Sequence, residues 1–167
     1  GDALYREGSF ESGLQDAKGF LNSVQQNKNA SSATSEAHFL SGLCLMGLKQ
    51  YKKAIQEFRT ILDTQPSFAS ADRVAFEMGT AQLLSGQKKD AEKTFHMVVS
   101  KYPQGSRTAD AWFEIGEARF EAKAWDDATD AYEHAIESVI DRDVMFQLLE
   151  RHAWGIIFPI WQSCSCT

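Results

Sequence analysis

Histidine is the side chain best suited to move protons or bind a metal near neutral pH, and the chain contains four. No two of them stand four residues apart with a carboxylate at metal-ligand spacing, and the H-E-x-x-H sequence of zinc hydrolases is absent. The four are His38, His96, His134 and His152. We therefore expect no catalytic histidine and no metal site.

Carboxylates gather in one stretch, where Asp126, Asp127 and Asp130 follow Glu117 and Glu121. Paired carboxylates can perform acid–base catalysis, but this requires a pocket and a partner group that the sequence does not place. Asp126 and Asp127 open a predicted helix, where negative charge meets the positive end of the helix dipole and caps free N–H groups. With no glycine-rich phosphate loop either, we expect no catalytic residues, no cofactor and no enzyme.

The bulk composition excludes several kinds of partner. The net charge of -6 and the pI of about 5.2 argue against nucleic acid and anionic lipid, which both require a basic surface. No apolar run reaches the ~18 residues of a membrane span, so we expect no membrane insertion by this chain. Three cysteines, two of them in a terminal C-x-C, do not form a disulfide framework.

Small and aromatic residues recur at a spacing of 37 and indicate how the chain is built. Small residues let the two helices of a hairpin approach closely, aromatic residues fill the gaps between hairpins, and proline ends a helix. The recurring residues are Gly42, Gly79 and Gly116; Ala54, Ala91 and Ala128; Phe58, Phe95 and Tyr132; and Pro66 and Pro103. The pattern predicts an all-α solenoid of stacked antiparallel hairpins.

The same spacing predicts the helices and the units they form. We expect helices over about 9–24, 34–48, 51–64, 70–85, 88–101, 107–122 and 125–139. Residues 1–13 align with the stretch from Gly79 onward, so that Gly8 matches the turn residue Gly86. The expected units are a partial hairpin with a polar loop (1–33), three hairpins (34–70, 71–107 and 108–142) and an atypical C-terminal helix and tail (143–167).

This arrangement resembles the tetratricopeptide (TPR) repeat, and the resemblance implies a scaffold that binds a peptide or partner protein. Units of 37 residues, punctuated by the phrase YPQGS over 102–106, are similar to those of Tol-Pal-associated and outer-membrane-assembly TPR proteins. That likeness implies a bacterial envelope assembly and favours the periplasm over the cytoplasm.

In the TPR family, the first helix of each hairpin lines a concave groove. Carried onto this chain, the groove positions are Tyr5, Phe39, Leu43, Met46, Arg73, Phe76, Thr80, Leu83, Asp110, Phe113, Glu117 and Phe120, with Glu36 and Glu121 beside them. The phenylalanines, one repeat apart, suit recognition of an apolar segment but also suit packing between hairpins, and both interpretations stay open. Chaperone-tail-binding TPR domains use basic and Asn residues here, so that activity is not expected.

Two further readings of the function stay open. The chain could self-associate into a homo-oligomer through its first repeat or its apolar tail. It could also be the accessory TPR region of a larger enzyme. The tail at 155–167 reads as a cap on the last hairpin, as a segment that fills the groove, or as sequence foreign to the natural protein.

Overall fold

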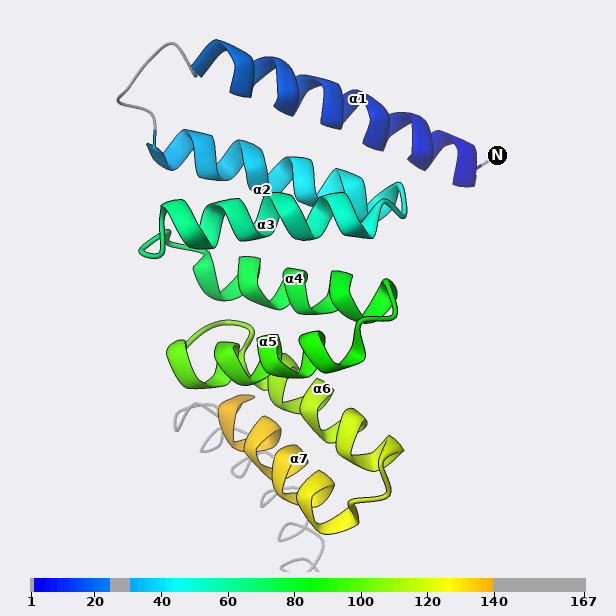
Figure 1. The fold of residues 1–167 in the computed structure, drawn as a ribbon, viewed down its shortest axis with the longest axis vertical. Helices are drawn as coiled ribbons and strands as arrows, with labels where there is room; N and C mark the ends of the chain where they lie inside the picture. Colours follow the sequence, from blue (N-terminus) through cyan, green and yellow to red (C-terminus); the bar gives the residue numbers. More distant parts are fainter. Residues whose placement is uncertain (1, 25–30, 140–167) are drawn as a thin grey trace, which may run out of the picture.

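The structure is a computed structural model that describes the backbone of residues 2–24 and 31–139 and the side chains of residues 8–23 and 32–138. Over these ranges the chain forms seven helices and no strand. They are α1 (Asp2–Val24), α2 (Ser31–Gly47), α3 (Tyr51–Thr64), α4 (Ala71–Leu84), α5 (Lys88–Lys101), α6 (Thr108–Glu121) and α7 (Trp125–Val139). Figure 1 shows them following one another along a single axis, with α1 at one end and α7 at the other. The all-α solenoid is confirmed.

Each helix packs against its neighbours in the chain, so that α2–α3, α4–α5 and α6–α7 are antiparallel hairpins and α1 lies against α2. Pro66 and Pro103 act as predicted, because α3 ends at Thr64 and α5 ends at Lys101. Most expected helix bounds agree with the structure to within one residue, and α2 begins three residues early. The polar stretch before it, residues 25–30, lies outside the described residues.

The prediction for the first helix was wrong. No turn is present at Gly8, and α1 runs continuously from Asp2 to Val24. Gly86 needs its positive φ of 82° in the turn after α4, whereas Gly8 stands among Leu, Arg and Glu, which favour helix. One glycine inside a helix costs only about 1 kcal/mol, which such neighbours offset. The described chain therefore starts with one continuous helix, without a turn at Gly8.

The turn that closes each hairpin uses the same backbone geometry three times. Lys49, Gly86 and Lys123, one repeat apart, have φ of 57°, 82° and 61°. The residue after each donates its N–H to a carbonyl five residues back, as Gln87 does to Gln82 at 2.8 Å. This is the Schellman motif, which satisfies the free carbonyls at a helix end. Only one of the three positions holds glycine, so the motif forms even where a lysine must adopt a left-handed conformation.

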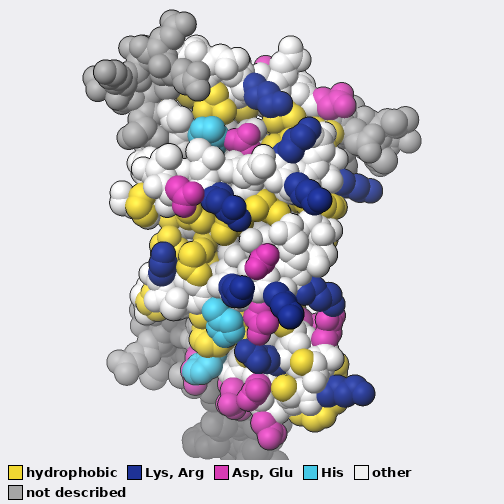
Figure 2. Space-filling model, in the orientation of Figure 1, with side chains coloured by type: hydrophobic (Ala, Val, Ile, Leu, Met, Phe, Trp, Pro, Cys, Tyr) yellow, Lys and Arg dark blue, Asp and Glu magenta, His cyan; other side chains and the backbone are white. Residues whose placement is uncertain are grey.

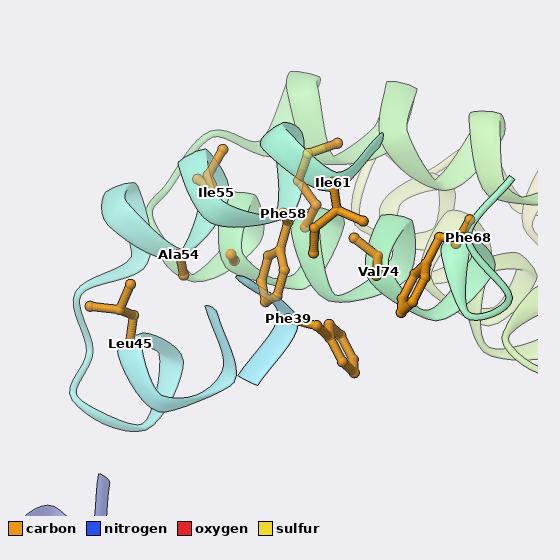
Figure 3. Close-up of a cluster of buried hydrophobic side chains, with 11 residues drawn as sticks. Phe39, Leu45, Ala54, Ile55, Phe58, Ile61, Phe68 and Val74 are labelled. Atoms are coloured by element: carbon orange, nitrogen blue, oxygen red, sulfur yellow. The ribbon is translucent and has the colours of Figure 1, made fainter. Parts of the chain in front are cut away.

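The hydrophobic core lies between the helices and repeats along the stack. Phe58 and Phe95 are 0% and 1% exposed, and each ring occupies the space left by a glycine of the facing helix. A Cβ at Gly42 would lie 2.3 Å from Phe58, and one at Gly79 would lie 2.6 Å from Phe95. Figure 3 shows the first cluster, in which Phe58 and Ile61 of α3 meet Val74 of α4. The glycines therefore allow the close approach that the pattern predicts, but these aromatic rings also fill the space inside the hairpin, and not only the gaps between hairpins where the pattern placed them.

A polar contact joins the start of α4 to the segment that follows α5, at the open end of the α4–α5 hairpin. The Asp72 carboxylate accepts hydrogen bonds from the backbone N–H of Ser106 at 2.7 Å and from its hydroxyl at 2.9 Å. Partial burial acts to raise the pKa of Asp72, but these bonds and those from the backbone of Arg73 and Arg107 outweigh it, so the pKa is lowered. The connection between α5 and α6 is thus held to the start of α4.

Candidate functional site

Phe39, Phe76 and Phe113 lie at equivalent positions of α2, α4 and α6, and we call the surface that carries them the first-helix face. Each ring packs on the aromatic side chain of its own hairpin, with centroids 6.0 Å apart for Phe39 and Phe58 and 5.7 Å apart for Phe113 and Tyr132. The exposed fraction rises along the stack: Phe39 is 9% exposed, Phe76 is half-buried, and Phe113 is 50% exposed. The three phenylalanines are therefore not one continuous open floor.

Arginines of the following hairpin cover the first two rings. The guanidinium of Arg73 lies 5.3 Å from the ring centroid of Phe39, and that of Arg107 lies 5.5 Å from the centroid of Phe76. A cation over an aromatic face is attracted by the ring quadrupole. Within 2–24 and 31–139, no cation lies over Phe113. The Arg73 and Arg107 side chains thus contribute to the burial of the Phe39 and Phe76 rings.

Besides Phe76, four of the predicted groove positions on α2 and α4 are half-buried. Leu43 and Met46 of α2 pack against the first core cluster, and Leu83 of α4 packs against the second. Thr80 turns its hydroxyl back onto its own helix, 3.2 Å from the carbonyl of Phe76. These four side chains therefore contact other parts of the hairpins and are only partly available to a binding partner.

Leu40 and Leu84, which sequence reasoning did not select, are the open apolar side chains of α2 and α4, with 57% and 55% exposed. Leu40 directly follows Phe39, and Leu84 lies eight residues after Phe76, so at 3.6 residues per turn both are rotated by roughly a quarter of a turn from the phenylalanine position. They hold the positions that Glu114 and Glu121 hold on α6, so the outward side of the first helices has two adjoining stripes, and the exposed leucines belong to the second. The spacing of 37 was the signal available in the sequence.

On α6 the predicted residues lie on one exposed side of the helix. Asp110 accepts a hydrogen bond from Arg107 at 2.7 Å. Glu117 accepts one from the Tyr132 hydroxyl at 2.6 Å, and this bond raises the pKa of Tyr132 to about 12. Phe120 is 53% exposed and meets Trp125 of α7 edge-on at 4.9 Å between centroids. Aromatic and acidic groups thus stand side by side.

Glu114 was not among the predicted groove residues. Asp110, Glu117 and Glu121 on the same helix each have a hydrogen-bond or ion-pair partner among the described residues. Burial, followed by the negative charges of Glu117 and Asp110, raises the pKa of the Glu114 carboxyl group. Glu114 also lines a hollow of about 210 Å³ between α5 and α6, whose floor includes Phe95 and Leu83. No salt bridge or hydrogen bond of its side chain occurs within the described part of the chain.

The remaining predicted positions are less informative. Tyr5 lies on α1 itself, because the turn expected at Gly8 is absent, and its side chain is outside the described set. Glu36 is exposed at the start of α2, and Glu121 pairs with Lys88 of α5 at 2.6 Å. The tail at 155–167 lies beyond the described residues.

Two of the histidines, His38 and His134, lie close to glutamate side chains. His38 Nδ1 lies 2.6 Å from Glu57 Oε2 and links α2 to α3. Among described residues, no three of His, Cys, Asp and Glu are grouped to hold a metal ion. None of the described helices has both the length and the apolar character to cross a membrane.

Charge is unevenly distributed along the stack. Figure 2 shows Lys and Arg side chains along most of one face, and a group of Asp and Glu side chains at its lower end, where α6 and α7 lie in Figure 1. Residues 108–139 contain nine acidic and two basic residues. The last described hairpin is therefore the acidic end of the molecule.

Comparison with known proteins agrees with this architecture. A tetratricopeptide repeat family model matches residues 76–142, and a second one matches residues 36–67. No catalytic family is among these matches. A comparison with curated protein sequences gives no match.

Three solved structures have a similar fold. The MamA RS-1 ArsTM double mutant has a TM-score of 0.60 and 23% identity, covering 80% of this chain and 68% of that chain. MamA MSR-1 C2 has a TM-score of 0.59 and 15% identity, covering 78% and 68%. A crystal structure of MamA has a TM-score of 0.56 and 14% identity, covering 78% and 89%. At these identities the likeness is one of fold.

Proposed function

This chain belongs to the tetratricopeptide repeat family and is a protein–protein interaction scaffold, and we propose that it holds its partner on the first-helix face. The observation that carries the proposal is where open apolar side chains lie. Of the seven large apolar side chains that are exposed among the described residues, four are on α2, α4 and α6: Leu40, Leu84, Phe113 and Phe120. Apolar side chains gathered on one face of a folded protein are typical of a binding surface.

The geometry suits a partner that lies along the stack. The first helices recur along the axis of the stack, so an extended peptide or a helix lying along that axis can contact α2, α4 and α6 in turn. Two of the other exposed apolar side chains, Trp125 and Ile136, are on α7, the last described helix, and Phe20 is on α1. These three side chains therefore lie on the first and last helices that the structure describes.

Site-specific photo-crosslinking tests the proposal. A photoreactive residue replaces Leu40, Leu84 or Phe120 in turn, and matched controls carry it at the exposed positions Lys52 and Lys93 of α3 and α5. All five sites are exposed, so the fold is expected to survive, and circular dichroism checks this. We expect a partner protein to be attached through the first three positions only.

Two outcomes would contradict the proposal. Attachment of the same partner through Lys52 or Lys93, and not through the first-helix positions, would place binding on the second helices. Attachment only of a second copy of this chain, with a molar mass in light scattering that rises with concentration, would favour self-association.

We further propose a bacterial envelope setting, which the 37-residue units and the phrase YPQGS over 102–106 support. The crosslinking is therefore performed on separate envelope and cytoplasmic fractions of bacterial cells. A partner found only in the cytoplasmic fraction would contradict this setting and leave the binding surface unaffected.

A further inference from the structure

In each of the first two hairpins, the phenylalanine of the first helix lies under an arginine that belongs to the following hairpin. Arg73 covers Phe39 at 5.3 Å, and Arg107 covers Phe76 at 5.5 Å. In the second hairpin, the hydrogen bond to Asp110, which outweighs partial burial, and the charges of Asp110, Glu77 and Asp72 raise the pKa of Arg107. The ring supplies a π face for the guanidinium, and the carboxylates around it supply the opposite charge.

The third hairpin repeats the phenylalanine and the following glutamate of the second, and no arginine lies over its ring among the described residues. Glu114 follows Phe113 as Glu77 follows Phe76, one repeat later, and Glu117 lies one turn further along α6. The Phe113 ring is 50% exposed. Within the described residues, Glu114 has no cationic partner, and the one bond to Glu117 comes from the Tyr132 hydroxyl. Burial of Glu114 beside two further carboxylates raises the pKa of its carboxyl group, so a cation placed here would relieve an existing cost.

The outward side of α6 has two parallel stripes. Phe113 and Phe120 form the apolar stripe, and the acidic one consists of Asp110, Glu114, Glu117 and Glu121. The acidic stripe has spacings of four, three and four residues and extends for roughly 16 Å at 1.5 Å per residue. A second helix lying along α6 presents side chains at these same spacings. The surface therefore matches an amphipathic helix with arginines on one stripe and apolar side chains on the adjoining one.

We propose that α6 receives an arginine-bearing amphipathic helix of a partner protein, with one guanidinium stacked on Phe113 between Glu114 and Glu117. This rests on the proposed function, and it specifies the chemistry of the partner at the acidic end of the scaffold. The nine acidic and two basic residues over 108–139 also attract a positively charged segment during encounter.

A synthetic probe tests the inference on the full chain. The probe is a labelled 14-residue peptide of Ala, Leu and Arg, with arginines spaced by four, three and four residues and leucines on the adjoining stripe. Two matched peptides replace every arginine with lysine or with glutamate. Fluorescence anisotropy measures affinity, and amide chemical shifts in NMR locate the binding surface. We expect the arginine peptide to bind more tightly than the lysine one, the glutamate peptide not to bind, and the shifts to centre on α6.

Protein variants separate stacking from bulk charge. Phe113→Leu keeps an apolar side chain but removes the π face, and we expect it to weaken arginine-peptide binding roughly threefold or more. The double variant Glu114→Gln and Glu117→Gln is expected to weaken it about tenfold or more. Phe76→Leu is the matched control, because Arg107 already covers that ring, and it should leave binding unchanged.

Several results would overturn the inference. These are equal binding by wild type and Phe113→Leu, equal binding of the arginine and lysine peptides, and shifts centred away from α6. Absence of peptide binding, with a concentration-dependent molar mass that Phe113→Leu abolishes, would show that another copy of the chain occupies the surface. If no peptide binds while crosslinking through Leu84 still attaches a partner, the inference fails and the proposed function stands.

Discussion

Replacing Gly79 with alanine tests whether the glycines of the first helices set the distance between the two helices of a hairpin. A Cβ at this position would lie 2.6 Å from Cε1 of Phe95, against the 3.4–4 Å of an ordinary contact. Phe95 is 1% exposed and is enclosed by the second core cluster, so its ring has little room to move. The variant must therefore separate α4 from α5 or strain the ring.

The expected free energy change has two parts of opposite sign. Overpacking of a filled core costs typically 1–3 kcal/mol, and the contact distance puts this site in the upper part of that range. Alanine improves helix propensity by about 1 kcal/mol over glycine. The net expectation is a loss of roughly 1–2 kcal/mol of unfolding free energy.

Gly19→Ala is the matched control. Gly19 lies within α1, and a Cβ there meets nothing within 4 Å. Only the propensity term remains, so this variant should gain roughly 0.5–1 kcal/mol. Urea unfolding followed by circular dichroism at 222 nm compares both variants with the wild type. A Gly79→Ala variant as stable as Gly19→Ala would refute the reasoning, because it would show that the Phe95 ring moves aside at no cost.

Three further predictions concern single contacts, each measured by urea or thermal unfolding. Lys123→Gly should stabilise the chain by roughly 0.5–1 kcal/mol, because a φ of 61° strains a lysine and suits glycine; a loss of stability would contradict this. Asp72→Asn should cost roughly 0.5–1.5 kcal/mol at pH 7, since the charged acceptor of the two Ser106 bonds is lost. The folded-state pKa of Asp72 is lowered, so its contribution is present above the unfolded pKa near 3.8 and disappears as the pH falls through the folded value; a difference independent of pH would refute this assignment. Glu114→Gln should stabilise by roughly 0.4–1 kcal/mol at pH 7, because it removes two like-charge pairs on one helix. The folded-state pKa of Glu114 is raised, so the penalty is present at neutral pH and is relieved as the pH falls toward 4.5, where the advantage of the variant should vanish.

The opposite signs expected for Glu114 in stability and in binding follow from one cause. A carboxylate held beside two others without a cation destabilises the free chain and strengthens contact with a cationic partner. Residues that favour binding often lower the free energy of unfolding of the unbound protein in this way. Measurement of both quantities on the same Glu114→Gln variant therefore connects the stability prediction to the proposed partner.

The local pattern of the sequence was enough to determine the repeat, the hairpins and the close approach of their two helices. Gly42, Gly79 and Gly116 recur at a spacing of 37, and the helix periodicity that places such residues on one face depends only on neighbouring residues. The same locality explains why Pro66 and Pro103 predicted the ends of α3 and α5. Gly8 was misread because its likeness to Gly86 was taken to imply a turn, although the residues around it favour helix.

Only the tertiary structure decided which of the predicted groove residues are open. Phe39, Phe76 and Phe113 hold equivalent positions in the sequence, yet their exposure differs because Arg73 and Arg107 of the next hairpin cover the first two rings. Exposure depends on groups that are distant in the chain, so a pattern confined to one repeat cannot predict it. The raised pKa of the Glu114 carboxyl group depends in the same way on tertiary structure, because its largest cause is burial, followed by the charges of Glu117 and Asp110.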